Sequence, residues 1–115
     1  MAKFVMTPVE AKYNDVTVVT PEAATTASDG LEFKLKNNDA YAFVVVHNTG
    51  TGAGTITVKA PTKGSYAAAS SDLVSESIPA GGLAVIRVES ARYANNDGTV
   101  LLVPSAATVK AVAVY

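Results

Sequence analysis

The chain lacks cysteine and tryptophan and has a single histidine, His47, so its composition rules out several kinds of site. Without cysteine there is neither a disulfide nor a thiolate ligand for a metal, and the redox state of the compartment is irrelevant. A site built from several imidazoles is equally impossible. His47 ends a valine-rich segment, and we expect it to be structural. We expect no metal and no other cofactor.

Charge is also scarce, since nine basic and ten acidic residues give a net charge of −1. Nucleic-acid binding depends on clustered basic residues. The nearest approach to such a cluster is Lys34 and Lys36, so we expect no nucleic-acid partner. No apolar run approaches the ~20 residues of a membrane span, and the apolar stretch after Met1 is too short for a secretion signal. We therefore expect a protein that is made in the cytoplasm and contacts no membrane.

What the sequence does contain is a series of short alternating segments. Leu31, Phe33 and Leu35 alternate with charged residues, which is typical of a half-buried strand. Residues 41–47 are apolar on both faces, which predicts a central strand with both faces covered. Further strands are predicted over residues 15–20, 55–60, 72–78, 83–89, 99–103 and 108–114.

These segments are separated by turns at glycine, proline and asparagine, and no segment predicts a convincing helix. The pattern predicts an all-β, single-domain antiparallel β-sandwich of roughly seven or eight strands, of immunoglobulin-like or jelly-roll type. We expect a tight connection at 37–39 and the longest loop at 61–71.

The first fourteen residues precede the regular pattern and carry several apolar side chains. They are either an edge strand of the same sheet or an arm that lies on a neighbouring subunit. The predicted organisation is therefore an edge strand or arm over 1–14 and a β-sandwich domain over 15–115. At the other end, residues 109–115 are predicted to leave an exposed strand edge that could pair with a neighbour.

Two glycine- or oxygen-rich stretches superficially suggest ligand sites. Gly50, Gly52 and Gly54 have the spacing of a phosphate loop, but a strand and not a helix is predicted to follow, so we interpret them as a hairpin. Residues 95–98, Asn-Asn-Asp-Gly, begin like a calcium loop but lack the later bidentate glutamate, which favours a turn. No Gly-x-Ser-x-Gly elbow is present, and we do not expect an enzyme.

The two arginines, Arg87 and Arg92, lie in one segment. Arg87 shares a strand face with Glu89, which predicts either an exposed ion pair or a subunit contact.

That same segment carries a family resemblance. Residues 77–93 read S-I-P-A-G-G-L-A-V-I-R-V-E-S-A-R-Y, and D-G-T-V follows at 97–100. This resembles small virion proteins of tailed bacteriophages, in which a glycine turn precedes an I-x-V-E-S-A-R-Y/F strand and a D-G-T-V hairpin. With V-x-N-T-G at 46–50 and T-I-T-V-K at 55–59, the resemblance covers the chain from Tyr41 to Val103 and leaves out both ends.

The resemblance implies a capsid decoration or cement protein: a structural virion protein that binds the outer surface of a bacteriophage capsid lattice and stabilises it. The implied partners are the major capsid protein and further copies of this chain, with a trimer among the forms considered. The N-terminal arm, the 61–71 loop and the arginines are the expected contact surfaces, with candidate residues Phe4, Val5, Met6, Tyr13, Lys63, Tyr66, Arg87 and Arg92.

Two alternatives stay open. One is a head-completion or tail structural protein, which would occur in far fewer copies per particle. The other is a host- or glycan-binding module on the virion surface, which would use the loop aromatics Tyr66 and Tyr93.

Overall fold

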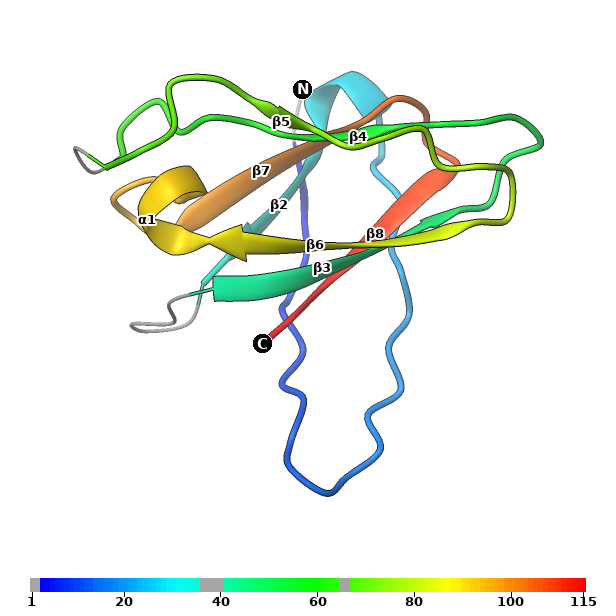
Figure 1. The fold of residues 1–115 in the computed structure, drawn as a ribbon, viewed down its shortest axis with the longest axis horizontal. Helices are drawn as coiled ribbons and strands as arrows, with labels where there is room; N and C mark the ends of the chain where they lie inside the picture. The colour runs from blue at the N-terminus through cyan, green and yellow to red at the C-terminus, as the bar shows by residue number, and fades with distance from the viewer. Residues whose placement is uncertain (1–2, 36–40, 65–66) are drawn as a thin grey trace.

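Two β-sheets form the fold in a computed structural model, which describes residues 3–35, 41–64 and 67–115 (Figure 1). The five-stranded sheet has the order β1 (Phe4–Val5), β2 (Leu31–Lys34), β7 (Thr99–Pro104), β4 (Ile56–Val58), β5 (Leu73–Val74). The three-stranded sheet has the order β6 (Leu83–Glu89), β3 (Tyr41–Asn48), β8 (Val109–Val114). A 3-10 turn, η1 (Ala27–Asp29), and one helical turn, α1 (Ser90–Tyr93), complete a mostly-β, single compact domain.

The five-stranded sheet is mixed, which corrects the expectation of a wholly antiparallel fold. β1 is its edge strand and pairs in parallel with β2, with Phe4 opposite Leu31. Between them the chain leaves the sheet, runs to β8 and returns through η1, so β2 starts in the same direction as β1. All other strand pairs of both sheets are antiparallel.

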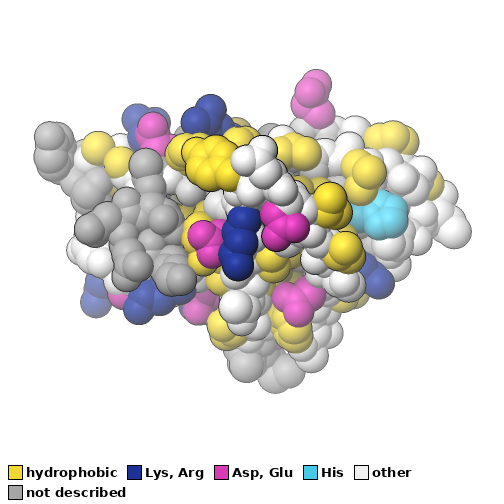
Figure 2. All heavy atoms as spheres, turned by 90° about the horizontal axis from the view of Figure 1, so that it is seen from below, with side chains coloured by type: hydrophobic (Ala, Val, Ile, Leu, Met, Phe, Trp, Pro, Cys, Tyr) yellow, Lys and Arg dark blue, Asp and Glu magenta, His cyan; other side chains and the backbone are white. Residues whose placement is uncertain are grey.

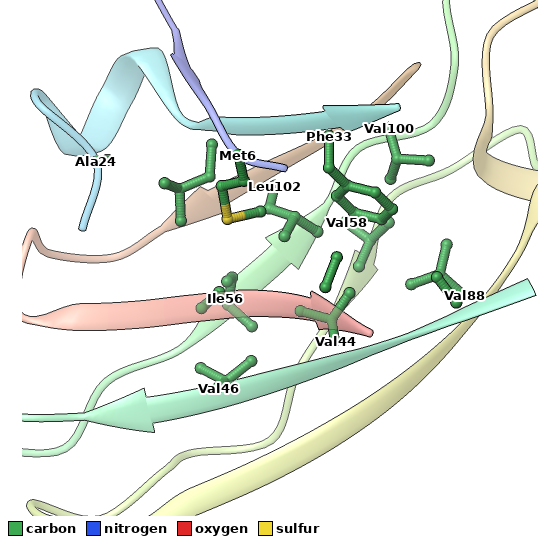
Figure 3. Close-up of a cluster of buried hydrophobic side chains, with 14 of the residues drawn as sticks. Met6, Ala24, Phe33, Val44, Val46, Ile56, Val58, Val88, Val100 and Leu102 are labelled. Atoms are coloured by element: carbon green, nitrogen blue, oxygen red, sulfur yellow. The ribbon is translucent and has the colours of Figure 1, made fainter. Parts of the chain in front are cut away.

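The alternation predicted for residues 31–35 is confirmed, and in β3 alternate residues are buried. Leu31, Phe33 and Leu35 are buried, as are Ala42 and the inward valines of β3. Figure 3 shows that side chains from both sheets meet in one core, whose labelled members are Met6, Ala24, Phe33, Val44, Val46, Ile56, Val58, Val88, Val100 and Leu102. Burying a side chain such as Phe33 stabilises the fold by about 1.5–3 kcal/mol relative to leaving it exposed.

The other strand predictions meet mixed outcomes. Strands at 83–89, 99–103 and 108–114 are confirmed to within a residue, whereas 55–60 and 72–78 shrink to β4 and to the two residues of β5. The strand predicted at 15–20 is wrong, because this segment extends from the domain without a ladder partner among the described residues. α1 was not predicted; at its C-terminal end the Ala94 N–H donates to the Ser90 carbonyl at 3.0 Å. The predicted connection at 37–39 lies outside the described residues.

Gly30 shows why the chain turns as it does before β2. Its φ of +82° is a left-handed conformation that favours glycine. A Cβ there would lie 2.5 Å from the Leu102 carbonyl oxygen of the neighbouring strand β7. The position therefore requires glycine both for its backbone and for close packing.

The residues after β1 attach the N-terminal segment to the second sheet. The Val9 N–H donates to the Ala113 carbonyl at 2.9 Å, and the Ala11 N–H donates to the Tyr115 carbonyl at 2.8 Å. After a long excursion, Glu22 pairs with Ala111 through two hydrogen bonds of 2.8 and 2.9 Å. The predicted open edge at 109–115 is therefore wrong: this edge of β8 is occupied by the chain itself.

Candidate interaction surfaces

The outer side of the three-stranded sheet is the first candidate. β3 is central in that sheet, as predicted, and its alternation turns Tyr41, Phe43, Val45 and His47 away from the core. The expectation that both faces of this strand are covered is wrong for the outer one. Tyr41 and Phe43 remain more than a third exposed.

β6 continues this surface towards the edge of the sheet. Leu83 and Val85 are 69% and 63% exposed. Because Leu83 pairs with His47 and Val85 with Val45, these side chains stand beside the outward residues of β3. We call Tyr41, Phe43, Leu83 and Val85 the outer apolar face. Seen from this side in Figure 2, yellow apolar side chains spread among a few charged groups and reach the cyan His47.

Arg87 lies at one end of the outer apolar face and stacks on its aromatic rings. Its guanidinium carbon is 4.2 Å from the Tyr41 ring centroid and 5.6 Å from that of Phe43. The two rings meet edge to face at 5.4 Å. A guanidinium over an aromatic face gains about 0.5–1 kcal/mol at an exposed site. The observed partner of Arg87 is thus aromatic, and no ion pair with Glu89 is recorded among the described residues.

The second candidate is the excursion between Ala11 and Glu22, over residues 12–21, which we call the projecting loop. It stands out from the rest of the molecule on the side of the three-stranded sheet (Figure 1). Tyr13, Val16 and Val18 are 99%, 87% and 86% exposed. Since soluble monomers rarely expose apolar side chains in groups, this loop and the outer apolar face are both candidate contact surfaces.

The contact residues predicted near the N-terminus differ in how far their side chains are buried. Met6 is only 3% exposed and lies in the core, so its side chain offers no surface to a partner. Phe4 is half-buried against the same core, whereas Val5 faces solvent. Tyr13 lies apart from them, in the projecting loop.

The remaining predicted contacts lie elsewhere. Lys63 and Arg92 are exposed, Lys63 in the 61–64 stretch and Arg92 in α1. The predicted Tyr66 contact lies outside the described residues. Among the predicted contacts that the structure describes, Arg87 alone borders the outer apolar face. The apolar run 41–46 is the sequence feature that forms this face, but such a run also predicts a covered strand.

Lys63 borders an open polar depression of about 540 Å³ on the five-stranded sheet. Asn95 organises one wall: its Oδ1 accepts from the N–H groups of Thr62 and Lys63, both at 3.1 Å, and its Nδ2 donates to the Thr99 carbonyl at 3.2 Å. One wall of the depression is therefore held by hydrogen bonds between the Asn95 side chain and the backbone of Thr62, Lys63 and Thr99.

Two carboxylates near this depression have lowered pKa values. The Thr99 hydroxyl donates to Asp97 at 2.7 Å, and this bond, helped by the Thr99 N–H, lowers the pKa of Asp97 from 3.8. The Lys59 ammonium donates to Asp72 at 2.8 Å and lowers the pKa of that carboxyl, with the Ala60 N–H contributing. These hydrogen bonds make Asp97 a turn-forming residue, as the Asp-Gly pair predicted.

The stretches that suggested ligand chemistry are built as loops. The residues that follow Gly50, Gly52 and Gly54 run into the strand β4, so the helix that a phosphate loop requires does not follow them. In the portion of the chain described, no three side chains of the metal-ligating types gather into a possible metal site. Nor does any helix there have the length and apolar character to cross a membrane.

Comparisons with known proteins give no match of any kind. No protein-family model, no curated protein and no solved structure is significantly similar to this chain.

Proposed function

We propose that this protein is a structural virion protein that binds the outer surface of a bacteriophage capsid lattice and stabilises it. On this proposal it is a decoration or cement protein and not an enzyme, and its partner is the major capsid protein. The proposed fold type is a two-sheet β-sandwich of the immunoglobulin-like or jelly-roll kind.

The observation that carries the proposal is the outer apolar face. A cement protein must hold several lattice subunits through a broad, rigid surface, and β3 and β6 offer one through seven consecutive residue pairs. Tyr41 and Arg87 stack there, and tyrosine and arginine are enriched among residues that dominate binding energy. The phage-like motif overlaps this surface, because its I-x-V-E segment is the end of β6 and leaves Arg87 and Glu89 exposed.

Co-sedimentation with expanded capsids that lack the protein tests this function, with bound copies counted per particle. We expect saturation in proportion to the number of lattice sites. Replacing Val85 with Glu should weaken capsid binding at least about tenfold, because a charge would be desolvated at the contact. Saturation at about a dozen copies, the stoichiometry of a ring at one vertex, would instead indicate a connector.

The matched control is Val74→Glu. Val74 is 60% exposed, like Val85, but belongs to the five-stranded sheet. It should bind capsids like the unmodified protein. Equal binding by both variants would remove the outer apolar face from the contact.

A further inference from the structure

Residues 15–20 in the projecting loop have a strand sequence without a strand partner. Asp-Val-Thr-Val-Val-Thr is rich in β-branched residues, which favour extended pairing. Within the described chain, the backbone bond recorded for this segment is local, from the Val16 N–H to the Asp15 carboxylate at 2.8 Å. The segment thus presents unpaired backbone groups together with two exposed valines.

Among the strands of the described residues, one forms a long open sheet edge. β1 and β5, at the edges of the five-stranded sheet, are two residues long each, and β8 is occupied by residues 9–11 and Glu22. β6 is seven residues long and forms the other edge of the three-stranded sheet. A long edge strand with exposed apolar residues is a template for a further strand.

A depression runs along β6, beside residues 83–86. It measures about 280 Å³ and lies between residues 75–79 and 83–86. Ala84 and Ile86 are only half-buried there, since the two sheets do not close completely at this edge. A strand added to β6 would turn alternate side chains into this depression.

We propose that residues 15–20 of one copy add as an antiparallel strand to β6 of a second copy. The register that suits both partners pairs residues as follows: Asp15 with Arg87, Thr17 with Val85, and Val19 with Leu83. Val16 and Val18 then face the depression, opposite Ile86 and Ala84.

The charges of the two strands and their lengths both favour β6 of a second copy as the partner, in this register. Asp15 meets Arg87 on the outer side, an opposite-charge pair across adjacent strands. The six residues of the donor match the seven residues of β6. The donor does not reach the β6 of its own molecule, because both ends of the projecting loop are fixed to β8, at the opposite edge of the sheet, and the loop extends away from it (Figure 1).

Such a contact joins two different surfaces of the same chain. A head-to-tail contact of this kind closes into a ring when its rotation allows. The added strand also lengthens the outer apolar face, because Val19 joins Leu83 on that side. This inference does not depend on the proposed function, and its tests use the purified chain alone.

The first test is sedimentation of the full-length chain from about 1 to about 100 μM, a range that detects association of moderate affinity. We expect self-association, weakened at least about tenfold in the double variant Val16→Asp and Val18→Asp. Tyr13→Ser, an equally exposed position in the same loop but outside the paired segment, should change it less than about twofold. Because all three side chains are exposed, the melting temperature at concentrations too low for association should stay the same. A strictly monomeric chain, or association that the double variant leaves intact, would falsify the proposal.

The second test uses the absence of native cysteine. A chain with Thr17→Cys is mixed with a chain with Val85→Cys and oxidised. We expect a disulfide-linked heterodimer, because the two positions are direct neighbours in the proposed register. Thr17→Cys mixed with Val5→Cys, at an exposed position on the other sheet, is the control. A yield no higher than that of the control overturns the register and the strand pairing with it.

Discussion

Asn48 is a buried polar residue that connects three turns of the chain. It is 1% exposed, and its Nδ2 donates to the carbonyls of Gly52 at 2.8 Å and Ile78 at 2.9 Å, while its Oδ1 accepts from the Gly50 N–H at 3.0 Å. The V-x-N-T-G motif marked this residue without showing its role. Position in the sequence does not reveal that Ile78, far along the chain, supplies a partner carbonyl.

Replacing Asn48 with Ala should reduce the free energy of unfolding by about 2–4 kcal/mol, because the buried Ile78 carbonyl and two partly buried backbone groups lose their partner. Urea denaturation measures this change. Thr51→Ala, at an exposed position of the same loop, should change the free energy by less than about 0.5 kcal/mol. Similar values for the two variants would mean that water replaces the Asn48 bonds at no cost.

Asp97 gives the protein a defined sensitivity to acid. Its folded pKa lies below 3.8, so on acidification the unfolded chain takes up a proton first and stability falls. The contribution of Asp97 is complete well above pH 3.8 and disappears as the pH drops through the lowered folded pKa. Asp72 acts in the same direction.

Thr99→Val should therefore make stability less dependent on pH between about pH 5 and pH 2, because the hydroxyl that lowers the Asp97 pKa is gone. Thermal unfolding across this range measures the slope. Thr99→Ser keeps the hydroxyl and should keep the dependence of stability on pH. The pH dependence caused by Asp72 should remain in both variants. If stability falls with pH equally in the Thr99→Val and Thr99→Ser variants, the Thr99 hydroxyl does not lower the pKa of Asp97.

At the scale of elements, Met6, directly after β1, helps to anchor that strand in the domain. The Met6 N–H donates to the Glu32 carbonyl at 2.7 Å, and the Met6 side chain lies in the core. Met6→Ala should lower the free energy of unfolding by about 2–4 kcal/mol, since a cavity replaces a buried side chain. Val5→Ala, next to it but exposed, should cost less than about 1 kcal/mol. Denaturation of the two variants compares them directly, and equal small losses would show that β1 is not held in solution.

How far the sequence predicts these elements depends on what pairs with each. Alternation identified the buried side of residues 31–35 and the extent of β6 and β8, because one face of each is fixed by the core. Residues 15–20 are rich in β-branched residues, yet they form no strand, since composition says nothing about whether a partner strand exists. The parallel pairing of β1 with β2 could not be predicted from the sequence either, because it results from the path that residues 6–24 take between the two strands.

The candidate surfaces were predictable only in part, for a related reason. The run from Tyr41 to Val46 is apolar on both sides, which a covered strand and an exposed contact surface share. Only the structure distinguishes them, by leaving Tyr41 and Phe43 exposed. Arg87 was predicted as a contact, but its stacking on Tyr41 depends on a strand pairing that the sequence does not specify.

At the scale of the whole molecule, the two surfaces lie on one side. The outer apolar face covers the three-stranded sheet, and the projecting loop rises from beside β8 in the same direction. The five-stranded sheet instead presents a polar depression with paired ions, Lys3 with Glu32 at 2.9 Å and Lys59 with Asp72 at 2.8 Å. This asymmetry suits a protein that lies against a partner on one side and faces water on the other.

The pairing of residues 9–11 and Glu22 with β8 also sets an order of events during synthesis. These residues leave the ribosome long before their hydrogen-bond partners in and just after β8. Contacts between such distant parts of a chain form slowly and leave apolar segments exposed in the meantime. The N-terminal segment therefore cannot complete its pairing until β8 has left the ribosome.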